Sequence, residues 1–182
     1  QEGAGLDRSL HCLDVTGEFP GVLQPTGLFA ARTLGVFPDQ SLLWCLPQVN
    51  SIGAFGNLVF SNWDASNQIT FFNCVVDRPI YRYSTQGHKV GLVILDRRAY
   101  WEFQSVTGRF NARRGDGTFV NQLSARGLVQ YLFSLLGEPA NCDVLPDNVY
   151  PEVAWDVASV RLEIRRLCQM YGCVVSLNLD NS

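Results

Sequence analysis

The chain has 182 residues and a net charge of −3, with 47% hydrophobic and 17% charged residues. This balance is typical of a globular protein, and the acidic charge excludes a general attraction to phosphate backbones, so specific nucleic-acid binding is not expected. No apolar run approaches the roughly 18 residues that a membrane span needs. Because charged residues are scarcer than usual, some apolar surface is predicted to contact other chains.

Residues 1–40 carry glycine and proline at short intervals, which predicts an irregular N-terminal arm with one brief strand or turn of helix. From residue 41 to residue 121, short apolar runs alternate with turn residues, as in an antiparallel meander. Gly115-Asp116-Gly117 is predicted to close this region as a tight turn with positive φ at a glycine. The predicted strands are Leu42–Leu46, Leu58–Phe60, Ile69–Val76, Ile80–Tyr83 and Lys89–Leu95.

The last of these strands runs into a row of charged and aromatic residues. Apolar side chains point to both sides of Lys89–Leu95, so both faces are predicted to be covered. Asp96 follows directly and is expected to accept hydrogen bonds, from a neighbouring arginine or from backbone N–H groups, that fix the corner. Tyr100–Phe103 alternates in polarity and predicts a second, half-exposed strand with an aromatic face that needs a partner.

After residue 121 the apolar period becomes helical. Ser124 is a good N-cap for a helix that Gly137 ends. A linker rich in proline and asparagine covers residues 138–156, and a second helix is predicted from Ser159 to Gly172. A final strand is predicted from about residue 175 to residue 179.

This order of elements predicts an α+β fold, in which an antiparallel β-sheet or small β-barrel carries two added α-helices. Three regions are expected. They are an irregular arm at residues 1–40, a β-rich barrel or sheet domain at residues 41–121, and a helix-linker-helix-strand region at residues 122–182 that packs on it.

Six cysteines and two histidines are present, without a C-x-x-C pair. Their scatter does not fit a four-ligand zinc site, so no metal site is expected. Reduced cysteines that act as small core residues are predicted, which fits synthesis in a reducing cytoplasm. The glycines near Gly53-Ala54-Phe55-Gly56 lack the Lys-Ser/Thr that binds nucleotide phosphates, so no cofactor is expected.

Two sets of residues offer alternatives to a purely structural role. Asp96 and Glu102 lie among aromatic residues and are candidates for the carboxylate pair of a hydrolase. Nearby arginines would hold both carboxylates ionised as ion pairs, so a non-enzymatic protein is favoured. Arg114-Gly115-Asp116 at a hairpin tip suggests a host-ligand binding module, although Gly-Asp-Gly is also the sequence that a tight turn demands.

Several segments resemble, in the same order, segments of hub or tip proteins from tailed-bacteriophage tails, over roughly residues 60 to 180. The central one is Ile94-Leu95-Asp96-Arg97-Arg98, followed by an aromatic pair and Gly108-Arg109-Phe110-Asn111-x-Arg113. The others are Ile69 to Asp77, Ser124-Ala125-Arg126, Leu145-Pro146-x-x-Val149-x-Pro151-x-Val153-x-Trp155-Asp156 and Leu167-Cys168-x-x-Tyr171-Gly172-Cys173.

The resemblance implies a β-barrel related to tail-tube subunits, with helical additions. It also implies a structural component of the virion tail, made in the host cytoplasm, that forms a homo-oligomer, a trimer, and contacts the tail tube and distal tail or other tip proteins. No catalytic residue is expected. The residues expected to contact partners or neighbouring subunits are Arg97, Arg98, Trp101 and Arg109.

Overall fold

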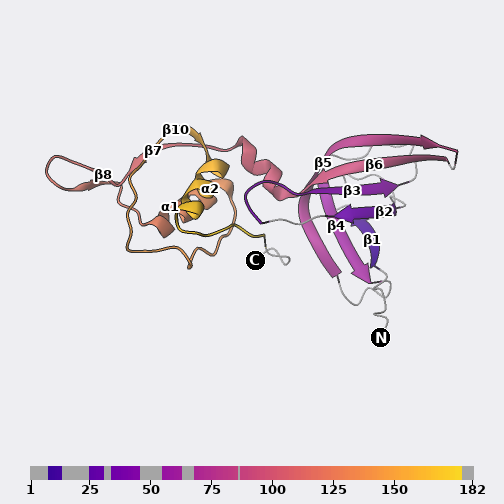
Figure 1. Ribbon diagram of the computed structural model, residues 1–182, viewed down its shortest axis with the longest axis horizontal. Coiled ribbons are helices and arrows are strands. Elements are labelled where there is room, and N and C mark those ends of the chain that lie inside the picture. The colour runs from indigo at the N-terminus through magenta and orange to yellow at the C-terminus, as the bar shows by residue number, and fades with distance from the viewer. Residues whose placement is uncertain are drawn as a thin grey trace. The chain divides into compact units, whose positions relative to one another are not determined.

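A computed structural model describes residues 8–13, 25–30, 34–45, 55–62, 68–85 and 87–177 (Figure 1). Only the backbone is described for residues 8–13, 25–30, 45, 55–62 and 68–72. The chain folds as two compact units. The sheet unit contains residues 38–99 and the two strands that precede residue 34, and the helical unit contains residues 34–37 and 100–177.

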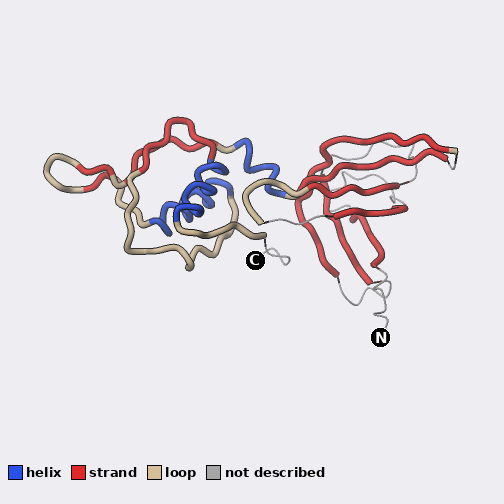
Figure 2. The backbone as a smooth tube through the Cα atoms, in the orientation of Figure 1, coloured by secondary structure: helices blue, strands red, loops and turns tan. Residues whose placement is uncertain are grey.

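The sheet unit is one antiparallel sheet with strand order β1-β4-β5-β6-β3-β2 (Figures 1 and 2). Its edges, β1 and β2, are not hydrogen-bonded to each other, so the sheet in the described part of the chain is open rather than a closed barrel. The strands are β1 (Arg8–Leu13), β2 (Pro25–Ala30), β3 (Gln40–Cys45), β4 (Phe55–Asn62), β5 (Gln68–Ser84) and β6 (Gly87–Leu95).

The edge strands β1 and β2 correct the prediction of an irregular N-terminal arm. The predicted single brief strand is in fact two strands of six residues each. β1 pairs along its full length with β4, and β2 pairs with β3. Glycine and proline at short intervals therefore limited strand length without preventing pairing, because an edge strand needs hydrogen bonds on one side only.

β5 corrects a second prediction, in which Ile69–Val76 and Ile80–Tyr83 were two separate strands. The structure has one strand of 17 residues. A register shift between Val76 and Arg78 absorbs Asp77, so the chain bulges here instead of turning. Pro79 lies opposite Leu92 of β6, but β4 pairs with β5 only up to Val75, so the other edge of β5 has no neighbouring strand in the described chain at residue 79, and a proline is tolerated at such an edge.

The predicted burial of β6 on both faces is confirmed. Residues 90–94 are all buried, although their side chains alternate between the two sides of the sheet. Gly91 is needed on one face, since a Cβ there would lie 3.0 Å from the Trp44 ring. β6 pairs with β5 on one side and β3 on the other, so β5 and β6 are the two central strands of the sheet.

The helical unit surrounds α1 and α2 with short strands (Figure 2). β10 pairs with β7, and β8 pairs with β9. The 3₁₀ helix η1 links the two units, and the boundary between the units falls between Ala99 and Tyr100. The elements are η1 (Arg97–Phe103), β7 (Ser105–Phe110), β8 (Ala112–Arg113), β9 (Phe119–Val120), α1 (Ala125–Leu136), β10 (Val153–Ser159) and α2 (Val160–Met170).

Both predicted helices are confirmed. Ser124 caps α1 by accepting a hydrogen bond from the Gly127 N–H at 3.1 Å. Gly137 ends the helix in the left-handed conformation, with φ of 69°. α2 begins after Ser159, as predicted, but this serine makes no side-chain cap. Gly172, with φ of 66°, follows its end.

The helical unit has its own hydrophobic core. The apolar faces of α1 and α2 meet, and two tryptophans from η1 and β10 complete the packing. The α+β class is thus confirmed, with an open antiparallel sheet in one unit and helices in the other. The fully buried members of this core are Leu128, Leu132, Val160, Ile164 and Leu167.

Three predicted features differ from the structure in this unit. Tyr100–Phe103 is not a strand but the end of η1, because Trp101 turns into the core instead of alternating outwards. The predicted linker at residues 138–156 contains the start of β10. Residues 173–177 have no regular structure where a final strand was predicted, and residues 178–179 lie outside the described residues.

Candidate functional site

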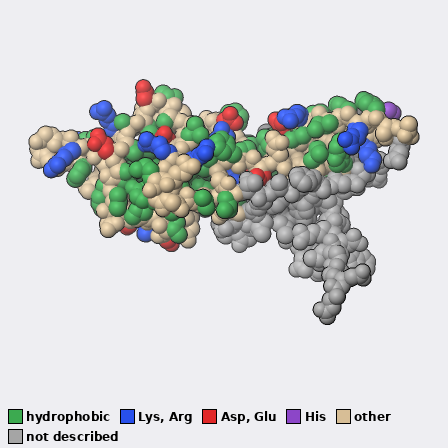
Figure 3. Space-filling view, in the orientation of Figure 1, with side chains coloured by type: hydrophobic (Ala, Val, Ile, Leu, Met, Phe, Trp, Pro, Cys, Tyr) green, Lys and Arg blue, Asp and Glu red, His purple; other side chains and the backbone are tan. Residues whose placement is uncertain are grey.

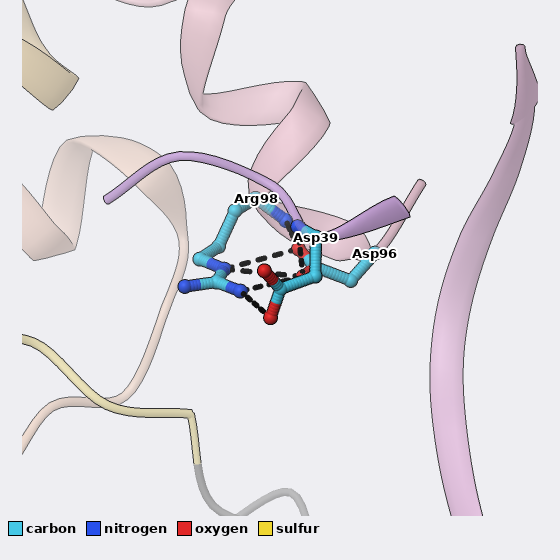
Figure 4. Close-up of polar contacts among 3 residues, drawn as sticks. All are labelled: Asp39, Asp96 and Arg98. Atoms are coloured by element: carbon cyan, nitrogen blue, oxygen red, sulfur yellow. Dashed lines mark hydrogen bonds and ion pairs between the residues drawn. The ribbon is translucent and has the colours of Figure 1, made fainter. Parts of the chain in front are cut away.

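The corner after β6 holds a buried arginine between two carboxylates (Figure 4). Asp39 lies directly before β3, and Asp96 lies directly after β6. These two strands pair, with Gln40 opposite Leu95, so the sheet register brings the two aspartates together. We call Asp39, Asp96 and Arg98 the corner cluster.

Asp96 is the main acceptor of the corner cluster. Its carboxylate receives the backbone N–H of Asp39 at 2.8 Å and the backbone N–H of Arg98 at 2.9 Å. It also receives the Arg98 guanidinium, with Nη2 at 2.7 Å and Nε at 3.1 Å. The prediction that Asp96 fixes the corner by hydrogen bonds from an arginine and from backbone N–H groups is therefore confirmed.

Arg98 also reaches the second carboxylate, since its Nη2 donates to Asp39 Oδ2 at 2.9 Å. The arginine side chain is about 1% exposed. Burial by itself lowers the pKa of Arg98, but the hydrogen bonds and negative charges of Asp96 and Asp39 outweigh that effect and raise its pKa. The guanidinium is therefore firmly charged, and the corner cluster is an ion-paired structural element.

The corner cluster also explains why η1 is helical. The Asp96 side chain accepts from the N–H two residues ahead, and the Asp96 carbonyl accepts from the Ala99 N–H at 3.0 Å. This is the pattern by which an aspartate starts a helical turn. Asp39 and Ala99 also stand close in sequence to places where the chain passes from one unit to the other. The cluster ties those two chain segments together within the sheet unit.

The four residues predicted to contact partners occupy different environments. Arg98 is buried in the corner cluster, and Arg97 is half-buried. Trp101 is buried in the helical core, where its indole N–H donates to Glu138 Oε1 at 3.2 Å. Arg109 is exposed on β7. The structure thus gives Arg98 and Trp101 partners within the chain, and the partner-contact role stays a prediction.

The two carboxylates of the alternative hydrolase each have an arginine of their own. Asp96 binds Arg98, and Glu102 lies 3.6 Å from the Arg161 guanidinium. The Glu102 side chain is largely exposed, in the other unit of the chain. Among the described residues, no three Cys, His, Asp or Glu side chains group so that they could hold a metal ion. The geometry favours ion pairing over acid–base chemistry for both carboxylates.

Asn111 is a site that sequence reasoning did not single out for its role. It is 2% exposed and has a φ of 59°. Its side-chain amide donates to the carbonyls of Leu123 and Pro151 at 2.7 and 2.8 Å, and its Oδ1 accepts from the Leu123 N–H at 2.8 Å. Asn111 therefore joins the end of β7 to the segments that enter α1 and β10.

The hairpin of β8 and β9 carries Arg114-Gly115-Asp116 at its tip. Asp116 Oδ1 accepts from the Thr118 hydroxyl at 2.7 Å and from the Thr118 N–H at 2.9 Å. The hydrogen bond from the Thr118 hydroxyl is the main cause of the lowered pKa of Asp116, and the hydrogen bond from the Thr118 N–H lowers this pKa further. Gly117 has a φ of 85°, which confirms the predicted turn with positive φ at a glycine. Asp116 thus has a clear structural role in the turn.

None of the cysteines with described side chains forms a disulfide, as predicted, and these are Cys74, Cys142, Cys168 and Cys173. The side chains of Cys12 and Cys45 lie outside the described residues. Burial raises the pKa of Cys142. Burial, together with the nearby Cys173 and Cys142, raises the pKa of Cys168 to about 11. The thiolate is the reactive form, so these two thiols are shielded at neutral pH.

Alkylation of the native protein at pH 8 is therefore expected to spare Cys168. With a pKa of about 11, roughly one Cys168 in a thousand is a thiolate at this pH. The pKa of Cys168 is higher in the folded chain than in the unfolded chain, so the unfolded chain loses the thiol proton at a lower pH. The free energy of unfolding is therefore unaffected by this group below the ordinary thiol pKa and decreases as pH rises above it. Mass-spectrometric mapping after iodoacetamide treatment tests this, with all six cysteines expected to react after denaturation without reductant. Rapid native labelling of Cys168 would contradict the expected shielding.

None of the helices in the described part of the chain is long and apolar enough to cross a membrane. No protein-family model matches the sequence, and no curated protein matches it. Among solved structures, the chain is similar to the crystal structure of the tail protein from Neisseria meningitidis MC58, with a TM-score of 0.52 and 8% sequence identity. The similarity covers 93% of this chain and 50% of that chain, so this chain spans about half the length of the tail protein. At this identity the likeness establishes a shared fold.

Proposed function

We propose that the chain is a structural component of the tail of a phage or phage-like particle. In this proposal it is a hub protein at the tail tip, and copies of it form a ring between the tail tube and the distal tip proteins. The observation that carries the proposal is the fold shared with a tail protein over 93% of the chain. The resemblance of the motifs around Asp96 and Asn111 to those of tail hub proteins supports it.

The chemistry of the described residues fits a scaffold. Its buried polar groups are used to hold segments together, in the corner cluster and around Asn111. Many large apolar side chains remain exposed, as a subunit with several neighbours requires. The most exposed of these are Phe103, Val144, Tyr83, Val157, Leu34 and Val174.

Partner contacts in the proposed ring involve charged side chains of each unit. Of the four residues predicted to contact partners, Arg97 is half-buried and Arg109 is exposed, whereas Arg98 and Trp101 are buried within the chain. The accessible contact residues in this proposal are therefore Arg97 and Arg109. Arg98 and Trp101 would act by holding η1 in place. Three copies in the ring are proposed on the resemblance to hub proteins. Three identical chains can close into such a ring with cyclic symmetry.

The proposal predicts that the purified chain assembles and that it is found at the tail tip. Native mass spectrometry should show a discrete oligomer of three copies, and immunogold labelling of intact particles should mark one end of the tail. The labelling is independent of the oligomer mass. A chain that stays monomeric at high micromolar concentration and does not bind purified tails would refute the structural role.

A further inference from the structure

The hairpin of β5 and β6 extends past the strands that flank it. β4 pairs with β5 only up to Val75, and β3 pairs with β6 only from Val90 onwards. Residues 78–84 of β5 and 87–89 of β6 form this end of the hairpin, where residues 82–84 pair with residues 87–89 as a two-stranded ribbon in the described chain, and all of these residues are exposed. Basic and apolar side chains lie together at this end of the hairpin (Figure 3). We call this segment the ribbon.

The two faces of the ribbon differ. One face carries Tyr81 and Tyr83, which are 61% and 72% exposed, and His88 meets the Tyr83 ring edge-on at 4.7 Å. The other face carries Arg82 directly opposite Lys89 in the sheet register. Tyrosines and arginines are the residue types that most often dominate binding at protein interfaces. The ribbon therefore has the composition of a docking element.

The Arg82–Lys89 pair costs stability in the isolated chain. Like charges directly opposite each other on a sheet repel, and both side chains are exposed. Among the described residues neither one has an acidic partner. Arg82 instead stacks on the Trp44 ring, with its guanidinium carbon 5.2 Å from the ring centroid. An anionic partner would remove the repulsion, so this pair favours an acidic surface.

The helical unit offers such a surface in the loop between α1 and β10. Residues 138–152 contain four carboxylates and no lysine or arginine. Asp143 and Asp147 have side chains that are 78% and 67% exposed, and Glu152 is exposed as well. Val144, at 80% exposed, lies beside them. We call residues 138–152 the acidic loop.

The acidic loop is held in a fixed shape, which favours docking because little entropy is lost. Arg126 donates to the carbonyls of Leu145 and Asp143 at 3.2 and 3.1 Å. Its guanidinium lies 3.9 Å from the carboxylates of Asp143 and Asp147, at the limit of an ion pair. The Arg126 guanidinium thus hydrogen-bonds to the loop backbone, and the loop retains a net negative charge.

We propose that the ribbon of one copy docks on the acidic loop of a second copy. This inference rests on the proposed ring and names one pair of contact surfaces between its copies, in addition to the contacts proposed for Arg97 and Arg109. Each chain carries one basic, aromatic ribbon and one acidic, apolar loop, so their charges are complementary between copies. Because the two surfaces differ, the contact is head to tail, which is the kind that closes into a ring.

A charge-swap experiment tests the contact. One variant carries Arg82→Glu with Lys89→Glu, and the other carries Asp143→Lys with Glu152→Lys. Each is expected to weaken self-association at least about 100-fold, because attraction across the contact becomes repulsion. Combining all four substitutions in one chain should restore assembly, since the reversed ribbon of each copy then meets the reversed loop of the next copy. Sedimentation velocity at matched ionic strength measures the self-association of the unaltered chain and of every variant.

The matched control is Arg113→Glu with Arg114→Glu, on the exposed hairpin of β8 and β9. It changes the net charge by the same amount as the ribbon variant, and it should assemble like the unaltered chain. Restoration in the four-substitution variant also shows that these substitutions leave the chain folded.

Three outcomes overturn the inference. They are a ribbon variant that assembles normally, a folded four-substitution variant that fails to assemble, and an unaltered chain that is monomeric throughout. In each case immunogold labelling of the tail tip still reports on the proposed function. A ring that forms through other surfaces, or a monomer that marks the tail tip, would separate the two conclusions.

Discussion

Replacing Arg98 by methionine is expected to lower the free energy of unfolding by about 3–5 kcal/mol. The same guanidinium nitrogen binds both carboxylates of the corner cluster, at 2.7 and 2.9 Å. Its loss leaves Asp39 and Asp96 close together without the guanidinium that both of them bind, in a site where the arginine is fully buried. Urea unfolding at pH 7 measures the loss, and the raised pKa of Arg98 ensures that the unaltered chain carries the charge there.

The exposed ion pair of Arg78 and Asp77 provides the matched control. Its atoms are 2.7 Å apart, like those of the buried pair, but the Arg78 side chain is 62% exposed. Arg78→Met should therefore cost under about 1 kcal/mol. Combining Arg98→Met with Asp39→Asn and Asp96→Asn should recover part of the loss, because no uncompensated charge remains. Equal effects of Arg98→Met and Arg78→Met would contradict a buried, charge-dependent corner.

The features that the sequence predicted correctly are those encoded locally. Ser124 and Gly137 lie within the turns that they begin and end, so α1 could be read from its own residues. The burial of β6 followed from its own alternation. Asp96 was recognised as a corner acceptor because Arg98 stands two positions away.

The features that the sequence did not reveal depend on distant partners. Asp39 is 57 positions from Asp96, in a segment without a regular pattern. The pairing of β7 with β10 joins segments on either side of α1, and a register shift between Trp155 and Ala158 breaks the alternation of β10. η1 was misread as a strand because three aromatic residues in four positions are also typical of strands. Tertiary packing of Trp101 decided the outcome.

Asn111 shows how such long-range contacts combine at one residue. Its side-chain partners are 12 and 40 positions away in sequence, on Leu123 and Pro151. Its backbone N–H donates to the Val120 carbonyl at 2.8 Å, which places the strand pair of β8 and β9. A short amide side chain suits this position because asparagine tolerates positive φ better than other non-glycine residues. One residue therefore sets the geometry of three connections.

Asn111→Ala is expected to cost about 3 kcal/mol or more, since it leaves two carbonyls and one N–H without partners and forces alanine into the left-handed region. Asn111→Gly removes the same hydrogen bonds without the backbone strain, so the difference between the variants isolates the strain at about 1 kcal/mol. Asn121→Ala is the matched control, because Asn121 also has positive φ, 45°, but is exposed and donates only one side-chain hydrogen bond, to the Arg109 carbonyl. It should cost clearly less than Asn111→Ala in urea unfolding. Equal costs at the two positions would mean that backbone conformation, rather than the buried amide network, holds these three segments together.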